Sequence, residues 1–256
     1  MIDVVVDIGN SRVKWGQLVG SIVRQVAAVD HDPFGWTSQA ALLLKGKVRW
    51  TVASVVPITT RLFAEWCAGR GEECRVVSKA SDIPLTLNLD KTSSVGIDRL
   101  LAALAAKQRA TPAIIVTLGT AITIDLVDDA GVFQGGAILP GTLLLAKSLN
   151  DYTAQLPLLP LHSYQSFSAP GKNTEAAITV GIHAAVLGAC RVLIEHYTQQ
   201  CHKMPLVFLA GGGVGELNQK ELGLPNEVQG PFPLVLEGLA EVVRSGFNSL
   251  GNSSQA

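Results

Sequence analysis

Residues 113–140 read AIIVTLGTAITIDLVDDAGVFQGGAILP. Three short apolar runs lie in this stretch, at 113–118, 122–127 and 132–139, and Gly-Thr and Asp-Asp-Ala-Gly stand between them. Runs rich in Ile and Val that are bounded by Gly and Asp are typical of β-strands joined by tight turns. The stretch therefore predicts three consecutive strands.

The beginning of the chain repeats this plan. Three apolar segments follow one another there, at residues 2–6, 13–18 and 22–29. The order of strand, glycine-containing turn, strand, turn and strand thus occurs twice, which indicates a duplicated α/β unit. We place the boundary around Arg109 to Pro112 and predict two domains, residues 1–110 and 111–256.

The remaining elements follow from the spacing of apolar residues. Helices are predicted at 59–67, 95–107, 142–149, 174–197 and 234–247, and further strands at 47–56 and 205–209. The second of these strands leads into Gly211-Gly212-Gly213. The resulting order of strands and helices is that of a two-domain α/β protein.

Composition excludes several classes of protein. With 48% hydrophobic and 16% charged residues among 256, the chain has enough apolar surface for a large core and is not disordered. A formal net charge of -1 provides no overall attraction to nucleic acid or to an anionic membrane, so we expect neither as a partner. The N-terminus carries Asp3 and no basic region before its apolar run, and the four cysteines lack metal-ligand spacing, so we expect a cytoplasmic protein with reduced thiols.

The first chemical constellation is Asp7-Ile8-Gly9-Asn10-Ser11, with Lys14 shortly after it. Gly9 permits a tight turn in which backbone N–H groups and the side chains of Asn10 and Ser11 face an anion. Asp7, at the strand end, is suited to hold hydrated Mg²⁺. The alternative is an ordinary hairpin turn, which Gly-Asn also favours.

Two further turns carry glycine. Gly119-Thr120-Ala121, followed by Asp125, occupies the matching place in the second half, and two such turns facing each other can hold the two ends of a triphosphate. Gly211 and Gly212 follow a buried strand and leave room for a flat ring or a ribose against the backbone. An ordinary strand-to-helix turn remains the alternative for this last segment.

These three turns, in this order, resemble the two phosphate loops and the adenosine loop of the ATPase superfamily that includes actin, the sugar kinases and the heat-shock chaperones. Four segments resemble signature segments of the type III pantothenate kinases: Asp7–Ser11, Gly96–Arg99, Gly119–Asp125 and Gly135–Gly141. Their combination is highly specific. It implies a duplicated actin-like, or ribonuclease H-like, ATPase fold, in which two α/β domains enclose a nucleotide cleft.

The resemblance also implies an activity: ATP-dependent phosphorylation of pantothenate to phosphopantothenate, the first step of coenzyme A biosynthesis. Asp98 lies in the family's catalytic position, where its carboxylate accepts the hydroxyl proton. Arg99 is similar to the family's pantothenate-binding arginine and can pair with both oxygens of a carboxylate. The implied ATP- and phosphate-binding residues are Asp7, Gly9, Asn10, Ser11, Lys14, Thr120, Gly211 and Gly212, with Asp7 as the Mg²⁺ ligand. The implied substrate-binding residues are Gly96, Ile97, Asp98, Arg99 and Thr174.

Each of the substrate residues also has a structural interpretation. Asp98 and Arg99 suit a solvated ion pair at the start of a helix, where Asp favours the first turn. Asn173-Thr174-Glu175 suits a helix start. The residues alone leave both interpretations open.

One position departs from the family. The family usually has Asp two residues before the glycine of the second phosphate turn, where it binds an activating monovalent cation, potassium or ammonium; this chain has Thr117. A neutral hydroxyl is a weaker cation ligand, so the departure puts the cation requirement in doubt.

Three readings of function follow from the resemblance. The first is a pantothenate kinase acting as a homodimer, with the apolar helices around Leu143 and Ala184 as interface elements. The second is a non-catalytic accessory relative, which Thr117 favours and which the retained Asp7 and Asp98 oppose. The third is a kinase of the same fold with a different small-molecule acceptor.

Overall fold

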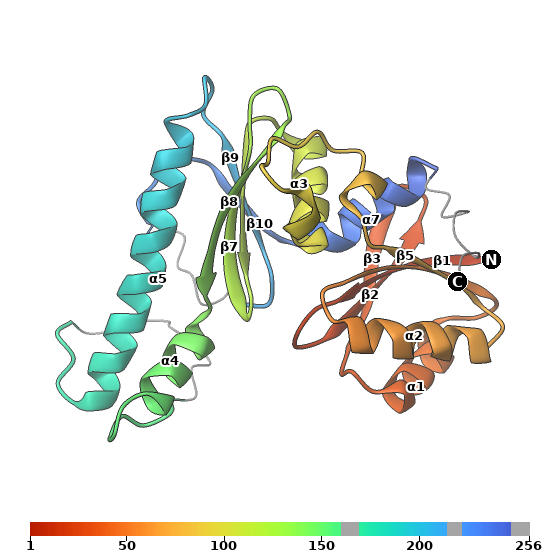
Figure 1. Ribbon diagram of the computed structural model, residues 1–256, viewed down its shortest axis with the longest axis horizontal. Coiled ribbons are helices and arrows are strands. Elements are labelled where there is room, and N and C mark those ends of the chain that lie inside the picture. The colour runs from red at the N-terminus through yellow and green to blue at the C-terminus, as the bar shows by residue number, and fades with distance from the viewer. Residues whose placement is uncertain (160–168, 214–221, 247–256) are drawn as a thin grey trace. The chain divides into compact units, whose positions relative to one another are not determined.

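The computed structural model describes residues 1–159, 169–213 and 222–246, and the chain forms two compact units (Figure 1). Unit 1 comprises residues 1–86 and 90–105 together with the C-terminal segment from 233 onward. Unit 2 comprises residues 87–89 and 106–232. Each unit contains one five-stranded sheet.

The sheet of unit 1 has the order β3-β2-β1-β4-β5. Its strands are β1 (Ile2–Ile8), β2 (Val13–Val19), β3 (Ile22–Val29), β4 (Val48–Ser54) and β5 (Glu73–Val77). The first three are antiparallel neighbours, and β4 and β5 run parallel to β1. Near the carboxyl end of β1, the register places Asp7 beside Lys14 of β2 and Ala53 of β4.

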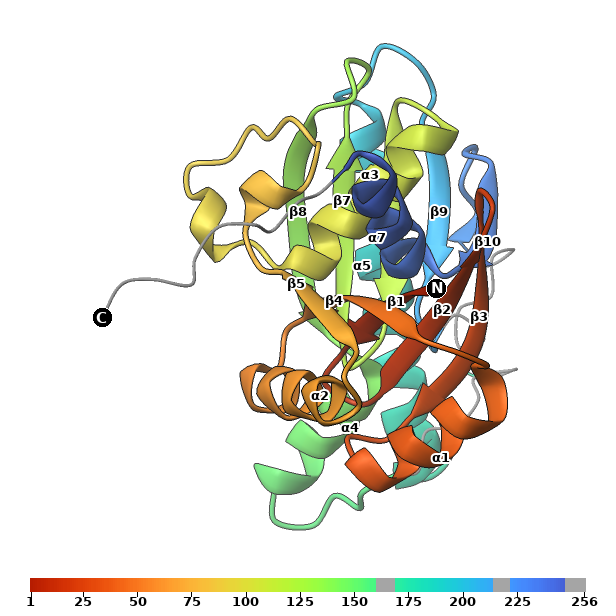
Figure 2. The ribbon, with the colours of Figure 1, turned by 90° about the vertical axis from the view of Figure 1, so that its right-hand side faces the viewer.

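Helices cover both faces of this sheet (Figure 2). They are α1 (Pro33–Leu43), α2 (Pro57–Gly69) and α7 (Leu234–Arg244), and the short helices η1 (Ala80–Asp82) and η2 (Thr92–Ser94) follow β5. Because side chains alternate along a strand, Val4, Val6 and Ile8 share the face that packs on α1 and α2. Val5 and Asp7 belong to the opposite face, which α7 covers.

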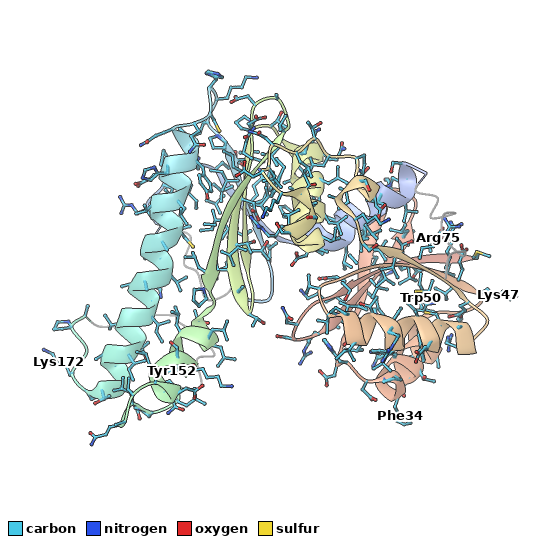
Figure 3. All side chains as sticks on the ribbon, in the orientation of Figure 1. Phe34, Lys47, Trp50, Arg75, Tyr152 and Lys172 are labelled. Atoms are coloured by element: carbon cyan, nitrogen blue, oxygen red, sulfur yellow. The ribbon has the colours of Figure 1, made fainter. Side chains whose placement is uncertain are left out.

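An aromatic cluster fills the core between the sheet and the first two helices. All four tryptophans of the sequence lie in it around Phe63, with ring centroids 5.1 to 6.4 Å apart: Trp15, Trp36, Trp50 and Trp66. Such edge-on and tilted contacts stabilise aromatic pairs beyond the burial of their area. In Figure 3 Trp50 lies within this core, whereas Phe34 of α1 points outward.

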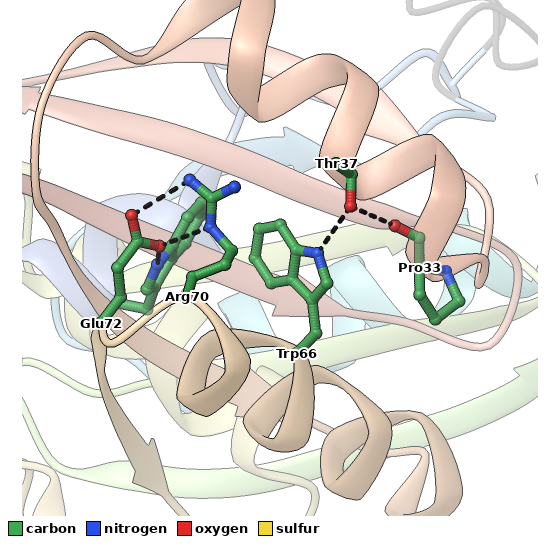
Figure 4. A network of polar contacts seen from close by, with 6 residues as sticks. Pro33, Thr37, Trp66, Arg70 and Glu72 are labelled. Carbon is green, nitrogen blue, oxygen red and sulfur yellow. Dashed lines mark hydrogen bonds and ion pairs between the residues drawn. The ribbon is translucent and has the colours of Figure 1, made fainter.

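Polar contacts close the edge of the cluster (Figure 4). The Glu72 carboxylate accepts hydrogen bonds from Trp50 Nε1 at 2.8 Å and from Arg70 Nε at 2.9 Å. The Arg70 guanidinium lies 4.9 Å from the ring centroid of Trp66, whose Nε1 donates to Thr37 Oγ1 at 2.9 Å. The indole N–H groups of Trp50 and Trp66 are therefore satisfied although their rings are packed in the core.

The compact units do not divide at the predicted domain boundary. α3 (Ile97–Arg109) crosses from unit 1 into unit 2 after residue 105, and α7 returns to unit 1 although it is last in sequence. The physical reason is burial, because α7 places apolar residues against β1 to β4 and is buried at Leu234, Leu236 and Leu239. Residues 233–246 thus group with residues 1–86 and 90–105 in one compact unit.

The sheet of unit 2 has the order β10-β9-β6-β7-β8. Its strands are β6 (Ala113–Leu118), β7 (Ala121–Val127), β8 (Phe133–Pro140), β9 (Leu206–Ala210) and β10 (Val228–Phe232). Its first three strands are antiparallel and the last two run parallel to β6. Numbered from the first strand of each unit, both sheets have the order 3-2-1-4-5, so the predicted duplication is confirmed.

Among the described residues of unit 2, α4 (Thr142–Asp151) and α5 (Thr174–Thr198) flank the second sheet. One face of α5 packs on β6 and β7 through Val186, Cys190 and Ile194. An 18-residue window of α5 has a mean hydropathy of 1.9, so by length and composition the helix is apolar enough to cross a membrane. A third of the residues in that window are buried within the structure. A helix that packs one face on a core passes the same test.

Candidate functional site

The turn between β1 and β2 forms as the sequence predicted. The Gly9 N–H donates to the carbonyl of Arg12 at 3.1 Å, and this bond closes a short loop at the carboxyl end of β1. Asn10 and Ser11, within that loop, are exposed. The turn therefore presents backbone and short polar side chains to solvent beside the end of the strand, as an anion cradle requires.

Asp7 lies at the base of this turn with its carboxylate only 13% exposed. Lys14 Nζ lies 4.0 Å from Asp7 Oδ2. Burial raises the pKa of Asp7 to about 6, the charge of Lys14 lowers it, and the charge of Asp98 raises it. The Asp98 charge thus acts on Asp7, and a cation bound to Asp7 would stabilise its ionised carboxylate against both the burial and the repulsion.

Asp98 stands in the first turn of α3, and its position depends on a glycine. Its Oδ1 accepts a hydrogen bond from the Arg99 N–H at 2.9 Å. A Cβ placed on Gly96 would lie 2.5 Å from the same oxygen, so any side chain at this position would force the Asp98 carboxylate to move. Gly96 therefore leaves the space that the Asp98 carboxylate occupies. Ile97, Asp98 and Arg99 are half-buried.

The turn between β6 and β7 repeats the first one in unit 2. The Gly119 N–H donates to the carbonyl of Ala121 at 3.1 Å, two residues later, whereas the Gly9 N–H in unit 1 donates to the carbonyl three residues later; Thr120 is exposed at the tip of the shorter turn. Counting back from each glycine, Thr117 occupies the strand position that Asp7 occupies in β1, beside Ala210 where Asp7 has Ala53. The two turns share a backbone plan, and only the first has a carboxylate at its base.

Three glycine segments of unit 2 meet at this turn. A Cβ on Gly141 would lie 2.3 Å from the carbonyl oxygen of Gly119, and one on Gly211 would lie 2.1 Å from that of Leu118. Gly211 also has a φ of +95°, and the Gly213 N–H donates to Leu118 O at 3.0 Å. The predicted phosphate turn and the predicted adenosine segment are therefore in backbone contact. Gly212 is exposed, and a Cβ placed on it would meet nothing within 4 Å.

Gly141, the last residue of the segment Gly135–Gly141 and the N-cap of α4, is not among the predicted site residues. The Gly141 N–H donates to Thr120 O at 2.9 Å, so this residue holds the tip of the turn. The signal in the sequence is the glycine directly after Pro140, before an apolar helix, but its contact with a turn some twenty residues earlier requires the fold.

Thr174 is the first residue of α5, as its helix-start interpretation predicted. The Asn173 side chain caps the helix, because its Oδ1 accepts from the Ala176 N–H at 2.8 Å. Thr174 also lines a pocket of about 610 Å³ between α4 and α5, whose other lining residues include Leu149 and Ile178. The structure thus places Thr174 in unit 2, at an apolar pocket, whereas Asp98 and Arg99 belong to unit 1.

The described residues contain no cluster of three or more His, Cys, Asp or Glu side chains that would form an all-protein metal cage. Mg²⁺ in phosphoryl-transfer sites is usually held by one or two carboxylates together with substrate phosphates. The buried Asp7, with the Asp98 charge acting on it, fits that pattern.

The chain is similar to known proteins both in sequence and in structure. The model of one protein family, described as type III pantothenate kinase, matches residues 4–196. A protein named type III pantothenate kinase from Alkalilimnicola ehrlichii is 32% identical over 247 residues, which cover 94% of this chain and 97% of that protein. Its namesake from Synechococcus elongatus is 32% identical over 254 residues, covering 96% and 98%.

Solved structures share the fold at low sequence identity. A Campylobacter jejuni protein described as a putative Baf family transcriptional activator superposes with a TM-score of 0.59 at 17% identity, covering 95% of this chain and 98% of that one. MreB 5 of Spiroplasma citri, solved with AMPPNP, superposes with a TM-score of 0.54 at 10% identity, covering 96% and 97%. With the repeated strand order, these likenesses establish the actin-like ATPase fold.

Proposed function

The chain belongs to the type III pantothenate kinase family, and on that premise we propose that it transfers the γ-phosphoryl group of ATP to the primary hydroxyl of pantothenate. The observation that carries the proposal is the geometry of unit 1, where the nearly buried Asp7 lies at the base of the Gly9 turn, 4.0 Å from Lys14 Nζ, and Asp98 stands in the first turn of α3. Phosphoryl transfer needs a cradle for phosphate, a cation and one carboxylate near the acceptor hydroxyl. Unit 1 contains candidates for all three.

Asp98 is the proposed proton acceptor. As the pantothenate hydroxyl oxygen forms its bond to the γ-phosphorus, the bond from that phosphorus to the leaving oxygen of ADP breaks, and the hydroxyl proton passes to the Asp98 carboxylate. Gly96 supports this role, because it leaves room for the carboxylate above the start of α3. Arg99 adds a guanidinium that suits the pantothenate carboxylate, since its planar fork binds two oxygens at once.

The phosphate groups of ATP are proposed to contact the β1–β2 turn through Gly9, Asn10 and Ser11, with Lys14 as a positive charge beside them. Asp7 would hold Mg²⁺, which when bound neutralises phosphate charge during transfer. In unit 2, the proposed phosphate contact is Thr120. The contact between the Gly211 segment and the Leu118 carbonyl supports an adenosine surface next to that turn, formed by Gly211 and Gly212.

The dependence on a monovalent cation is proposed to be weaker than in a relative with Asp at the position of Thr117. Thr117 is half-buried at the end of β6 and supplies a neutral hydroxyl where a carboxylate would supply a full charge. A weakly bound monovalent ion competes poorly with its own hydration unless charge or closely placed oxygens surround it.

Assembly and location stay proposals. A homodimer is supported by exposed apolar side chains on α4, where Leu143 is 57% and Leu144 40% exposed, and by the exposed small residues of α5 near Ala184. The cytoplasmic location is an expectation from the sequence alone.

The test of the proposed function is the rate of ADP formation from ATP, with and without pantothenate, and with panthenol, in which a neutral hydroxymethyl group replaces the carboxylate. We expect ADP formation to depend on pantothenate and panthenol to be a much poorer acceptor, because Arg99 would lack its partner. ADP formation that pantothenate does not change would leave the fold in place with a different acceptor. Absence of ATP turnover under all conditions would support the non-catalytic reading.

A further inference from the structure

In unit 1, α7 lies between the sheet and α3. On one side, Leu236 Cδ1 would be 3.3 Å from a Cβ on Gly16 of β2, so this leucine packs directly on the strand backbone. On the other side, a Cβ on Gly238 would lie 2.1 Å from the Leu101 carbonyl oxygen of α3 and 2.6 Å from its carbonyl carbon. Leu236 and Gly238 are two residues apart, about 200° around a helix, so they mark opposite faces. α7 therefore separates the sheet from α3 and contacts both.

The contact at Gly238 is made between two backbones. Gly238 is buried, and the atoms nearest to its missing Cβ are the O, C and Cα of Leu101. A flexible side chain can swing away from an added methyl group, but helix backbone cannot, so a larger residue at 238 has to move α3 away from α7. Figures 1 and 2 both show the two helices next to each other.

The position of α3 matters because Asp98 stands in its first turn, three residues before Leu101. Asp7 lies on the sheet face that α7 covers, and it experiences the charge of Asp98. The distance between these two carboxylates therefore depends on the spacing of sheet, α7 and α3, and Gly238 fixes the second of those spacings.

We propose that Gly238 is a positioning residue for phosphoryl transfer: by allowing backbone contact between α7 and α3, it places the Asp98 carboxylate at its working distance from Asp7 and from the acceptor. The inference rests on the proposed function of Asp98. It assigns the C-terminal helix, which supplies none of the predicted site residues, a direct part in setting the geometry of the site.

The test compares Gly238→Ala with Gly69→Ala. Gly69 ends α2 in the same unit, with nothing within 4 Å of its Cβ position, so alanine there adds a methyl group without a contact. For Gly238→Ala we expect kcat with pantothenate to fall on the order of 10- to 100-fold, because a misplacement of about 1 Å can cost that much. The KM for ATP should stay within about twofold, since the β1–β2 turn is untouched. Gly69→Ala should match the wild type in both constants.

A compensating substitution separates positioning from loss of folding. Leu236→Val shortens the side chain that holds α7 off the sheet, so in the double variant with Gly238→Ala the helix can move toward the sheet and make room for the new methyl group. We expect the double variant to recover at least about fivefold of the lost kcat, although two core changes should not make it more stable. All variants are assayed at a temperature where tryptophan fluorescence shows unit 1 folded.

The outcomes are distinguishable. If the wild type and Gly69→Ala turn over pantothenate and Gly238→Ala has the same kcat, the positioning role is wrong and the proposed function stands. If kcat falls in Gly238→Ala and falls further in the double variant with Leu236→Val, Gly238 contributes to stability alone and the positioning role is likewise wrong. If the wild type does not turn over pantothenate, the proposed function and this inference fail together.

Discussion

Asp7 carries a carboxylate whose ionised form is disfavoured by burial, and burial together with the charge of Asp98 outweighs the attraction of Lys14. Its pKa is raised from 3.8 to about 6 in the folded chain. The pKa of Asp7 is higher in the folded chain than in the unfolded chain, so the protonated carboxyl favours folding. This contribution to the free energy of unfolding is fully present below about pH 3.8 and is lost as the pH rises through about 6.

For Asp7→Asn we therefore expect a pH-dependent gain in stability. With metal removed by a chelator, the variant should match the wild type near pH 3.8 and exceed it above about pH 6, by on the order of 2 kcal/mol in the free energy of unfolding. Urea unfolding followed by tryptophan fluorescence measures this, because all four tryptophans lie in unit 1 with Asp7. A variant that is less stable than the wild type at high pH would contradict the interpretation.

Gly96 provides a test of how closely the Asp98 carboxylate must be placed. A methyl group at 96 would lie 2.5 Å from Asp98 Oδ1, so Gly96→Ala forces the carboxylate into another position without altering its charge. We expect kcat to fall on the order of 10- to 100-fold while ATP affinity stays within about twofold. Unchanged kcat would show that Asp98 works equally well from a second rotamer.

Thr117 is the neutral counterpart of Asp7 in the second sheet. We predict that potassium raises the initial rate of the natural protein less than that of Thr117→Asp, in which a carboxylate is restored at the end of β6. The measurement is rate against potassium at constant ionic strength, with a bulky organic cation as the replacement. An equally sharp potassium requirement in both proteins would mean that Thr117 does not govern the ion site.

At the scale of elements, the turn after β9 illustrates why glycine is needed at one position and not at its neighbour. Gly211→Ala combines a positive φ with a clash against the Leu118 carbonyl, whereas Gly212→Ala meets nothing within 4 Å. We expect Gly211→Ala to lower the stability of unit 2 by about 1–3 kcal/mol and Gly212→Ala to leave it within about 0.5 kcal/mol. Thermal unfolding followed by far-UV circular dichroism measures both, and equal stability of the two variants would exclude strain at Gly211.

Most of the long or strongly patterned elements could be predicted from the sequence. β6, β7 and β8 lie within a residue or two of the predicted strands, because each is an apolar run between glycine and aspartate. α1, β5 and β10 were missed. α1 buries only Trp36 and Ala40, which leaves little periodicity, and β10 contains Gly-Pro, which reads as a break in a strand.

Parts of the candidate site also depend only on residues that are neighbours in the sequence. The turns at Gly9 and Gly119 could be predicted, because a strand that ends in glycine and short polar residues has few other conformations. The contacts of Gly141 and Gly238 could not, because each glycine meets backbone from a distant part of the sequence. Close approach between two backbones leaves no mark in the sequence beyond the glycine itself.

In the molecule as a whole, the two sheets have the same strand order, but the two units supply different functional side chains. Both present a glycine turn at the end of their first strand, but Asp7 and Asp98 belong to unit 1, and unit 2 supplies Thr117 and Thr120. The chain also returns from unit 2 to unit 1, because α7 follows unit 2 in sequence but packs in unit 1. Helical periodicity predicts that α7 buries one face, but it does not say which sheet that face covers.

Single-turnover transfer of a γ-labelled phosphoryl group from ATP to pantothenate tests whether Asp98 accepts the proton of the pantothenate hydroxyl. Wild type and Asp98→Asn are compared at equal occupancy by ATP, with binding measured separately for each. We expect labelled phosphopantothenate from the wild type, and from Asp98→Asn a rate lower by on the order of 10²- to 10⁴-fold with ATP affinity within about twofold. A variant that transfers label at more than about half the wild-type rate would contradict this expectation and leave Asp98 as the first-turn carboxylate of α3.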